Sequence, residues 1–211
     1  MTALESVQTL EQLELLASQD RTVGILLRII KVSCPTTFSN AVIEAISEWI
    51  EGATRQAHLY RGLKEDQITL FLITHLNASG FDATHDTSNG GHCDVVVKHS
   101  KGYIWLAEAK IHNGPEYIKG GYLQLTSRYA HGTQSSPIGG LLIYIFKSKA
   151  MNLLDEWREA VDREFSSEGH TTHDCPSGNK LVFISDLTCE RSGLPYQVNH
   201  FAVPLFFNPR A

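Results

Sequence analysis

The stretch GHCDVVVKHSKGYIWLAEAKI, residues 91–111, decides the fold class. Its two apolar runs, DVVV at 94–97 and YIWLAEAKI at 103–111, are rich in β-branched and aromatic residues, which favour strands. The KHSKG segment between them, 98–102, combines polar residues with a glycine, as short connections do. The stretch therefore predicts a hairpin of two antiparallel strands.

Three charged side chains fall inside this apolar hairpin. Side chains two positions apart in a strand point to the same face, so Glu108 and Lys110 project together. Asp94 opens the first strand, and antiparallel pairing could bring its carboxylate beside that of Glu108. Burying a charge without a partner or a metal costs several kcal/mol, so these residues indicate a functional cleft.

Two carboxylates and an ammonium in one cleft suit phosphodiester hydrolysis. This reaction needs a hard cation beside the scissile phosphate, and Mg²⁺ or Mn²⁺ prefers carboxylate oxygens such as those of Asp94 and Glu108. Lys110 could activate the attacking water or stabilise charge that develops on the phosphate. The competing interpretation is a solvated strand face that carries only a cross-strand ion pair.

Helical and strand patterns surround the hairpin. Before it, apolar residues at helical spacing predict helices up to the break at Cys34-Pro35, across 42–50 behind a cap at Ser39, and from Leu63 to Ser79 with a stop at Gly80. The short stretch 81–85 is ambiguous and is taken as a strand. The elements predicted after the hairpin are a helix at 117–129, a strand at 140–146, a helix at 154–165, and strands at 181–185 and 200–207.

The polar stretch 166–178, rich in Ser, His, Gly and Thr, favours a mobile loop. The complete order of elements predicts an α/β fold, with a mixed central sheet flanked by helices. A chain of this length and composition can bury one good core, so we expect a single domain over 1–211. Within it, 1–60 form a helical N-terminal extension and 61–211 the functional core.

Composition limits the cellular setting and the partners. The sequence has no apolar run long enough for a membrane span and no signal-peptide pattern, so we expect a cytoplasmic protein without a membrane partner. The four cysteines are widely spaced, which favours free thiols. The net charge of -5 argues against general polyanion binding, but basic residues outnumber acidic ones from 98 to 149. A polyanion would therefore meet the middle of the chain.

The motifs GGHCDVVV, with Asp94, and AEAKI, with Glu108 and Lys110, resemble those of the PD-(D/E)xK nucleases. That family includes restriction endonucleases, recombination nucleases and many phage-defence effectors. The resemblance covers the segment from Leu63 to Phe146 and implies a restriction-endonuclease-like core in the order αβββαβ, here with extra N-terminal helices. Cys93 stands where the family name has proline, at a position that varies among its members.

The resemblance implies roles for individual residues. Asp94 and Glu108 would be metal ligands, and Lys110 would activate water or stabilise the phosphate. Glu65 would be the auxiliary acid and a further metal ligand, and Asp66 competes with it for that role. An acid in the first turn of a helix is also favoured by the helix dipole alone, which is the simpler interpretation of Glu65.

A further pair of residues follows on the next predicted helix. Some family members place a Gln and a Tyr there to contact metal-bound water or phosphate, and Gln124 and Tyr129 match them. Their spacing is one residue longer than the usual QxxxY. Gln124 and Arg128 also lie four residues apart, so an ordinary polar helix face explains them as well.

These features predict a Mg²⁺- or Mn²⁺-dependent nuclease, with DNA favoured over RNA by the habit of the family. The resemblance implies an endonuclease or the nuclease component of a restriction or antiviral defence system, acting as a homodimer or with a partner protein. The alternative is a non-catalytic module that binds nucleic acid or protein on the same fold, which the acidic overall charge favours.

Two weaker patterns lie towards the C-terminus. His170, His173 and Cys175 could bind zinc if Cys189 or His92 supplied a fourth ligand, but a flexible polar loop is the favoured interpretation. The aromatic residues of the last apolar run could stack on bases, but a core strand is favoured; these are Phe201, Phe206 and Phe207. The sequence has no P-loop, zincin or serine-hydrolase motif.

Overall fold

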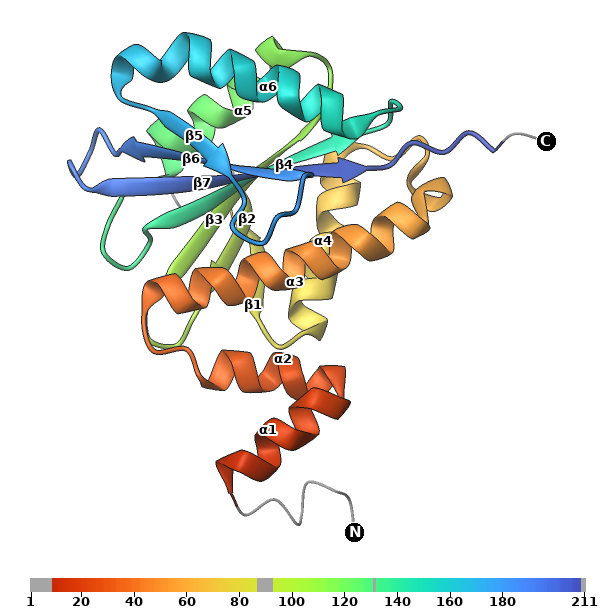
Figure 1. The fold of residues 1–211 in the computed structure, drawn as a ribbon, viewed down its shortest axis with the longest axis vertical. Helices are drawn as coiled ribbons and strands as arrows, with labels where there is room; N and C mark the ends of the chain where they lie inside the picture. Colours follow the sequence, from red (N-terminus) through yellow and green to blue (C-terminus); the bar gives the residue numbers. More distant parts are fainter. Residues whose placement is uncertain (1–8, 87–92, 131, 210–211) are drawn as a thin grey trace.

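A mixed sheet forms the centre of the molecule, with helices on both of its faces (Figure 1). The computed structural model describes residues 9–86, 93–130 and 132–209. Within this part of the chain the sheet has seven strands in the order β1-β2-β3-β4-β7-β6-β5. The predicted α/β class is confirmed.

The helices and strands follow the predicted order closely. The helices are α1 (Leu10–Gln19), α2 (Arg21–Ile30), α3 (Pro35–Arg55), α4 (Glu65–Ala78), α5 (Pro115–Leu123) and α6 (Ala150–Phe165). The strands are β1 (Asp82–Asp86), β2 (Cys93–Lys98), β3 (Ile104–Ile111), β4 (Ile138–Ile145), β5 (Thr171–Asp174), β6 (Val182–Thr188) and β7 (Pro195–Pro204). A π-helical turn, Gln124–Tyr129, continues α5, and short 3₁₀ turns cover Ala57–Tyr60 and Ser166–Glu168.

Strand directions divide the sheet into three parts. β1, β2 and β3 form an antiparallel meander, as the hairpin prediction requires. β3, β4 and β7 are parallel, and α5 makes the connection between the first two of them. β6 and β5 then continue antiparallel beyond β7. The centre of the sheet is therefore parallel and covered on both faces, which matches its nearly continuous apolar strands.

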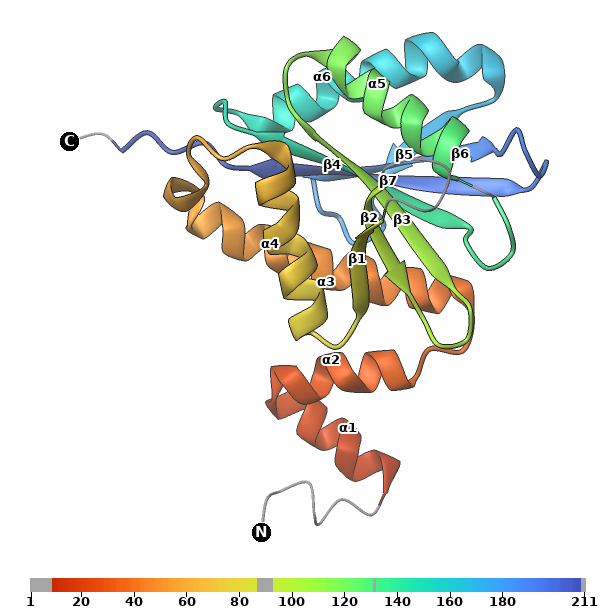
Figure 2. The same ribbon diagram turned by 180° about the vertical axis from the view of Figure 1, so that it is seen from behind.

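Each face of the sheet has its own hydrophobic core. Helices α3 and α4 cover one face, and α5 and α6 cover the other (Figure 2). The apolar row Val42, Ile46, Trp49 and Ile50 places α3 in the first core. The helical stretch before residue 60 is thus not one extension, because α3 belongs to the core whereas α1 and α2 project from the body in both views.

Helix α3 begins earlier than the sequence analysis predicts. Its first residue is Pro35, and Cys34 precedes it as the N-cap. The hydroxyl of Thr37 accepts the backbone N–H groups of Ser33 and Cys34 and so ties the chain entry to the first turn. The predicted cap at Ser39 is wrong, since Ser39 is a buried residue inside the helix.

The predicted mobile loop at 166–178 is also wrong in part. It contains a 3₁₀ turn and strand β5, which pairs with β6 from Thr171↔Asp186 to Asp174↔Phe183. β5 lies at the edge of the sheet and is polar on both sides, so it carries no alternating apolar signal. β7 begins at Pro195 rather than near residue 200, because polar residues mask its first half.

Smaller predictions have clear outcomes. The four cysteines are free thiols. Phe201 is buried in the core as expected, whereas Phe206 and Phe207 are exposed. Within the described residues, no helix has the length and apolar character needed to cross a membrane.

Candidate active site

The proposed site lies where β2 and β3 separate. The two strands pair from Lys98↔Ile104 to Val95↔Ala107. Beyond that point β3 stays paired with β4 on one edge, while on its other edge carboxylate oxygens accept the backbone N–H groups. The N–H of Ala109 donates to Oδ2 of Asp94 at 2.8 Å, and the N–H of Ile111 donates to Oε2 of Glu65 at 2.7 Å. Two acids thus continue the strand ladder in place of a neighbouring strand.

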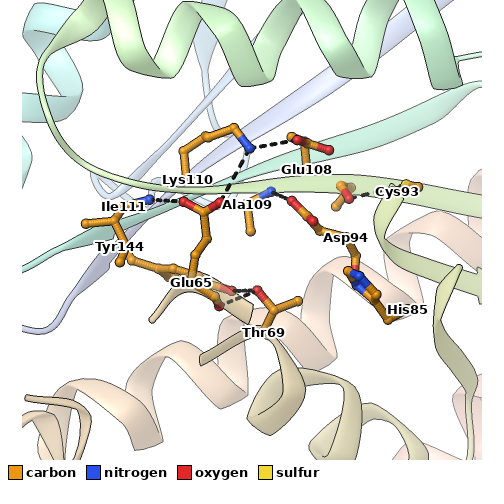
Figure 3. A network of polar contacts seen from close by, with 11 residues as sticks. Glu65, Thr69, His85, Cys93, Asp94, Glu108, Ala109, Lys110, Ile111 and Tyr144 are labelled. Atoms are coloured by element: carbon orange, nitrogen blue, oxygen red, sulfur yellow. Dashed lines mark hydrogen bonds and ion pairs between the residues drawn. The ribbon is translucent and has the colours of Figure 1, made fainter. Parts of the chain in front are cut away.

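Glu108 and Lys110 lie together on the α5 side of β3, as strand alternation predicts (Figure 3). The Lys110 Nζ atom donates to Oε1 of Glu108 at 2.8 Å. The Glu108 residue is only 3% exposed, and the Lys110 side chain is 13% exposed. This pair is therefore buried, which contradicts the interpretation as a solvated strand face.

Glu65 is the acid of helix α4 that reaches the strand. It is the first residue of α4, and its Oε1 atom lies 3.5 Å from Nζ of Lys110 while Oε2 binds the backbone of Ile111. Asp66 has only a minor effect on the site: burial is the main cause that raises the pKa of Asp94, and the charge of Asp66 adds a little to it. Of the two candidates, Glu65 is therefore the one that joins the cluster (Figure 3).

The carboxylates of this cluster resist ionisation. Burial, with help from the Asp94 charge, raises the pKa of Glu108 to about 7. Burial also raises the pKa values of Asp94 and Glu65, against the opposing effect of their backbone hydrogen bonds. For Lys110, burial disfavours the cation, but the hydrogen bond and charge of Glu108 outweigh it, and the pKa is raised. Three carboxyl groups thus share one ammonium in a buried setting, and their raised pKa values result from that burial and crowding.

Helix α5 approaches the cluster at a glycine. A Cβ atom at Gly121 would lie 2.7 Å from Cγ of Lys110 and 3.3 Å from Cγ of Glu108. Such a contact is too close for any side chain, so only glycine lets the helix lie against this pair. The predicted helix at 117–129 contains Gly120 and Gly121, but the sequence alone does not reveal this role; the signal is a small residue on the helix that follows the motif strand.

The π-helical turn accounts for the unusual spacing of Gln124 and Tyr129. An α-helix aligns residues four apart, whereas the i→i+5 pattern of a π-helix aligns residues five apart. The turn spans Gln124–Tyr129 and so compensates for the extra residue between them. Tyr129 is buried, and its pKa is raised by burial and then by the charges of Glu108 and Cys93. Gln124 keeps a buried Oε1 atom that has no hydrogen-bond partner in the described part of the chain.

Other predicted residues play different parts. Cys93 is fully buried in strand β2, its Sγ atom donating to the carbonyl oxygens of Val95 and Ala107, so it acts as a small core residue. Arg128 is exposed on the π-helical turn. Two lysines of the basic middle stretch are engaged elsewhere, Lys101 with the carbonyl of Val32 and Lys119 with the carboxylate of Glu164.

The suggested zinc cluster does not assemble. His170 binds the hydroxyl of Tyr122, whereas His173 binds a carboxylate oxygen of Asp186. Cys175 contacts the hydroxyl of Ser177, and Cys189 donates to the carbonyl of Ala130. His92 lies outside the described residues. The three residues of the pattern therefore serve separate local contacts.

The side chains of the acid cluster are of the type that binds a hard cation, but they are not arranged as a complete coordination site. Among the described residues, no three His, Cys, Asp or Glu side chains are grouped so that they could hold an ion. However, Oε2 of Glu108 is buried and has no hydrogen-bond partner among the described residues, and the three carboxyl groups of Asp94, Glu65 and Glu108 outnumber the one ammonium of Lys110. Carboxylate oxygens of this kind suit Mg²⁺ or Mn²⁺, and Asp94 and Glu108 are the residues that would hold it.

Comparison with known proteins adds no relative. The chain matches no protein-family model, and no curated protein or solved structure matches it.

Proposed function

We propose that the protein is a Mg²⁺- or Mn²⁺-dependent nuclease that hydrolyses phosphodiester bonds, with DNA as the favoured substrate. One observation carries the proposal: buried Glu108, pressed against Lys110 and close to Asp94, at the point where β2 and β3 separate. Evolution of a stable core alone would not favour an excess of buried carboxylates, because unpaired charge is costly to bury.

The order of elements supports the same proposal. α4, β1, β2, β3, α5 and β4 follow one another as in the αβββαβ core of restriction-endonuclease-like proteins. The two motif residues of β3, Glu108 and Lys110, and the acid at the start of β2, Asp94, fall on the elements where the PD-(D/E)xK resemblance requires them. We infer a nuclease of this superfamily, acting in restriction or antiviral defence as a homodimer or with a partner.

Each residue has a defined task in the proposed reaction. A divalent cation, when bound, would polarise the scissile phosphate and acidify a water molecule. Asp94 and Glu108 would hold that cation, and Glu65 would keep the end of β3 and the ammonium of Lys110 in place. Lys110 would donate hydrogen bonds to the phosphate or orient the attacking water. Gln124 would offer its unpaired amide oxygen to the same water.

Plasmid and single-stranded DNA, incubated with the pure protein, test this proposal. We expect cleavage with Mg²⁺ or Mn²⁺ and none with excess chelator. Glu51→Gln serves as a matched control for Glu108→Gln, because Glu51 is an exposed acid of α3 that pairs with Arg55 across one turn, far from Glu108 in the chain. Cleavage that survives chelation, or that Glu108→Gln leaves unchanged, would contradict the proposal.

A non-catalytic binding module remains the second candidate. It is favoured by the closed arrangement of Lys110, whose ammonium already binds Glu108 and Glu65, and by the net charge of -5. Such a module would bind its partner without hydrolysis and would tolerate Lys110→Ala. The DNA assay therefore separates the two candidates directly.

A further inference from the structure

A second buried polar cluster lies beneath helices α5 and α6. The indole N–H of Trp157 donates to Nδ1 of His200 at 3.0 Å, and Nε2 of His200 lies 2.8 Å from the hydroxyl of Ser185. The Ser185 hydroxyl lies 3.3 Å from the hydroxyl of Tyr122, which in turn lies 2.8 Å from Nδ1 of His170. The first four residues are buried, and His170 is half-buried at the end of the series.

The direction of each hydrogen bond follows from the first one. An indole N–H can only donate, so Nδ1 of His200 accepts and its ring carries the proton on Nε2. His200 therefore donates to Ser185, and Ser185 is not activated as a nucleophile. The Ser185 hydroxyl is left to donate to Tyr122, and the Tyr122 hydroxyl donates to Nδ1 of His170. The series therefore has four hydrogen bonds, and each is made by one hydrogen, from the Trp157 indole, the His200 ring, the Ser185 hydroxyl and the Tyr122 hydroxyl in turn.

Protonation of His170 breaks this arrangement. A doubly protonated imidazole has no acceptor, so Nδ1 of His170 would bring a fifth hydrogen to the four hydrogen bonds. One hydroxyl hydrogen of Tyr122 or Ser185 would then be buried without a partner, which is costly. We propose that His170 is a proton-operated latch, which fastens helix α5 through Tyr122 while it is neutral and loosens the helix when it is protonated.

The surroundings of His170 determine the pH range of the latch. Burial lowers the pKa of His170, against the opposing charges of Glu168 in the preceding 3₁₀ turn and Glu190 after β6. Among the described residues, Tyr122 of α5 bonds to the ring, His200 of β7 feels its charge, and Phe165 of α6 stacks on it. Because the pKa is lowered in the fold, the fastening is complete above the ordinary histidine pKa, about 6.5, and is lost as the pH falls through the folded value.

The latch acts on the helix that touches the proposed active site. Tyr122 follows Gly121, the residue that lies against Lys110 and Glu108. A shift of α5 would therefore change the packing over this pair, and Gln124 would move with it. This consequence for catalysis rests on the proposed nuclease function, whereas the latch itself does not.

Hydrogen exchange of the α5 amides, 115–123, at pH 7.5 and 5.5 tests the latch on the intact chain. After correction for the intrinsic exchange rate, wild-type protection should fall on the order of 10-fold at the lower pH. His170→Gln should keep its protection at both pH values, because the amide oxygen accepts from Tyr122 and does not titrate. His173→Gln is the matched control and should behave as the wild type, since His173 pairs with Asp186 instead.

The alternative outcomes are distinct. If His170→Gln loses as much protection as the wild type, the effect comes from another group, such as Glu108, and the proposal is overturned. Wild-type protection that does not change between the two pH values would also overturn it. If His170→Gln fails to fold, imidazole ¹⁵N spectra of the wild type decide: His170 and His200 should both carry their proton on Nε2 at pH 7.5, and a proton on Nδ1 of His170 would overturn the latch. Cleavage by wild type and His170→Gln, compared across the same pH range, then decides whether the latch governs the proposed nuclease.

Discussion

Two buried polar clusters, one around His200 and one around Glu108, are built in opposite ways. In the cluster around His200, every hydrogen bond has a donor and an acceptor, and the residues are neutral. In the cluster around Glu108, carboxyl groups outnumber the neighbouring ammonium, and one buried oxygen has no partner within the residues that the structure describes. The first arrangement stabilises the fold, whereas the second destabilises it.

The comparison separates a structural network from a candidate site. Satisfied polar networks specify the packing of a core, whereas buried carboxyl groups with raised pKa values are typical of functional sites. Gly121 and Tyr122, neighbours on α5, touch one cluster each. Helix α5 is therefore held by the hydrogen bond of Tyr122 and, one residue earlier, packs against Glu108 and Lys110.

Removal of the neutral network should have the largest effect. His200 is fully buried and stacks on Phe183 with ring centroids 4.1 Å apart. His200→Ala would leave a cavity and unpair Trp157 and Ser185, so we expect a loss of about 3–5 kcal/mol in unfolding free energy. Urea denaturation at pH 7.5 measures this, and a loss under about 1 kcal/mol would show that the network is dispensable.

Changes in the charged cluster should abolish cleavage without unfolding the chain. Asp94→Asn and Lys110→Ala should each lower the cleavage rate at least about 100-fold, the scale of a lost acid-base or electrostatic group. Circular dichroism should show that both variants stay folded. Cleavage by Lys110→Ala at the parental rate would reduce the cluster to a buried ion pair and favour the binding module.

Gly121→Ala tests the contact between α5 and the reactive pair. The added methyl group would meet the Lys110 side chain at 2.7 Å and push it away from Glu108. Overpacking costs about 1–3 kcal/mol, and the helix preference of Ala over Gly offsets only part of this, so stability should fall while cleavage drops roughly 10-fold. Gly120→Ala is the matched control, since a Cβ atom there meets no neighbour within 4 Å, and equal activity of the two variants would contradict the role of Gly121.

Glu108→Gln should stabilise the protein slightly, in contrast to His200→Ala. The pKa of Glu108 is raised in the fold to about 7, so its protonated form stabilises at low pH and that contribution is lost as the pH rises through this value. Gln does not titrate, so the gain in unfolding free energy should be about 1 kcal/mol at pH 8 and smaller at pH 5. Thermal unfolding at both pH values provides the measurement, and a variant less stable than wild type at pH 8 would contradict the electrostatic account.

Local patterns in the sequence were sufficient for much of the fold. The hairpin of β2 and β3 is predicted because its apolar runs flank a polar turn, and α4 because Ile68, Leu72 and Leu76 repeat along one face. The shared face of Glu108 and Lys110 follows from strand alternation alone. Such features depend on neighbours within a few residues, which is why the sequence reveals them.

Features that depend on distant contacts could not be predicted. β5 gives no apolar pattern, because an edge strand on the surface needs none, and it exists through its pairing with β6. The choice of Glu65 over Asp66 depends on how α4 meets the end of β3. The close approach of Gly121 and the π-helical turn at Gln124 likewise arise from the packing of α5 on the sheet.

The most direct test of the central claim is the binding of Mn²⁺, measured by titration calorimetry on wild type, Glu108→Gln and Lys110→Ala. If the excess carboxylates form a metal site, wild type should bind, and Glu108→Gln should bind more weakly because a charged ligand is lost. Lys110→Ala should bind equally or more tightly, because the neighbouring ammonium repels the cation. No binding by wild type, or an affinity that Glu108→Gln leaves unchanged, would contradict the account.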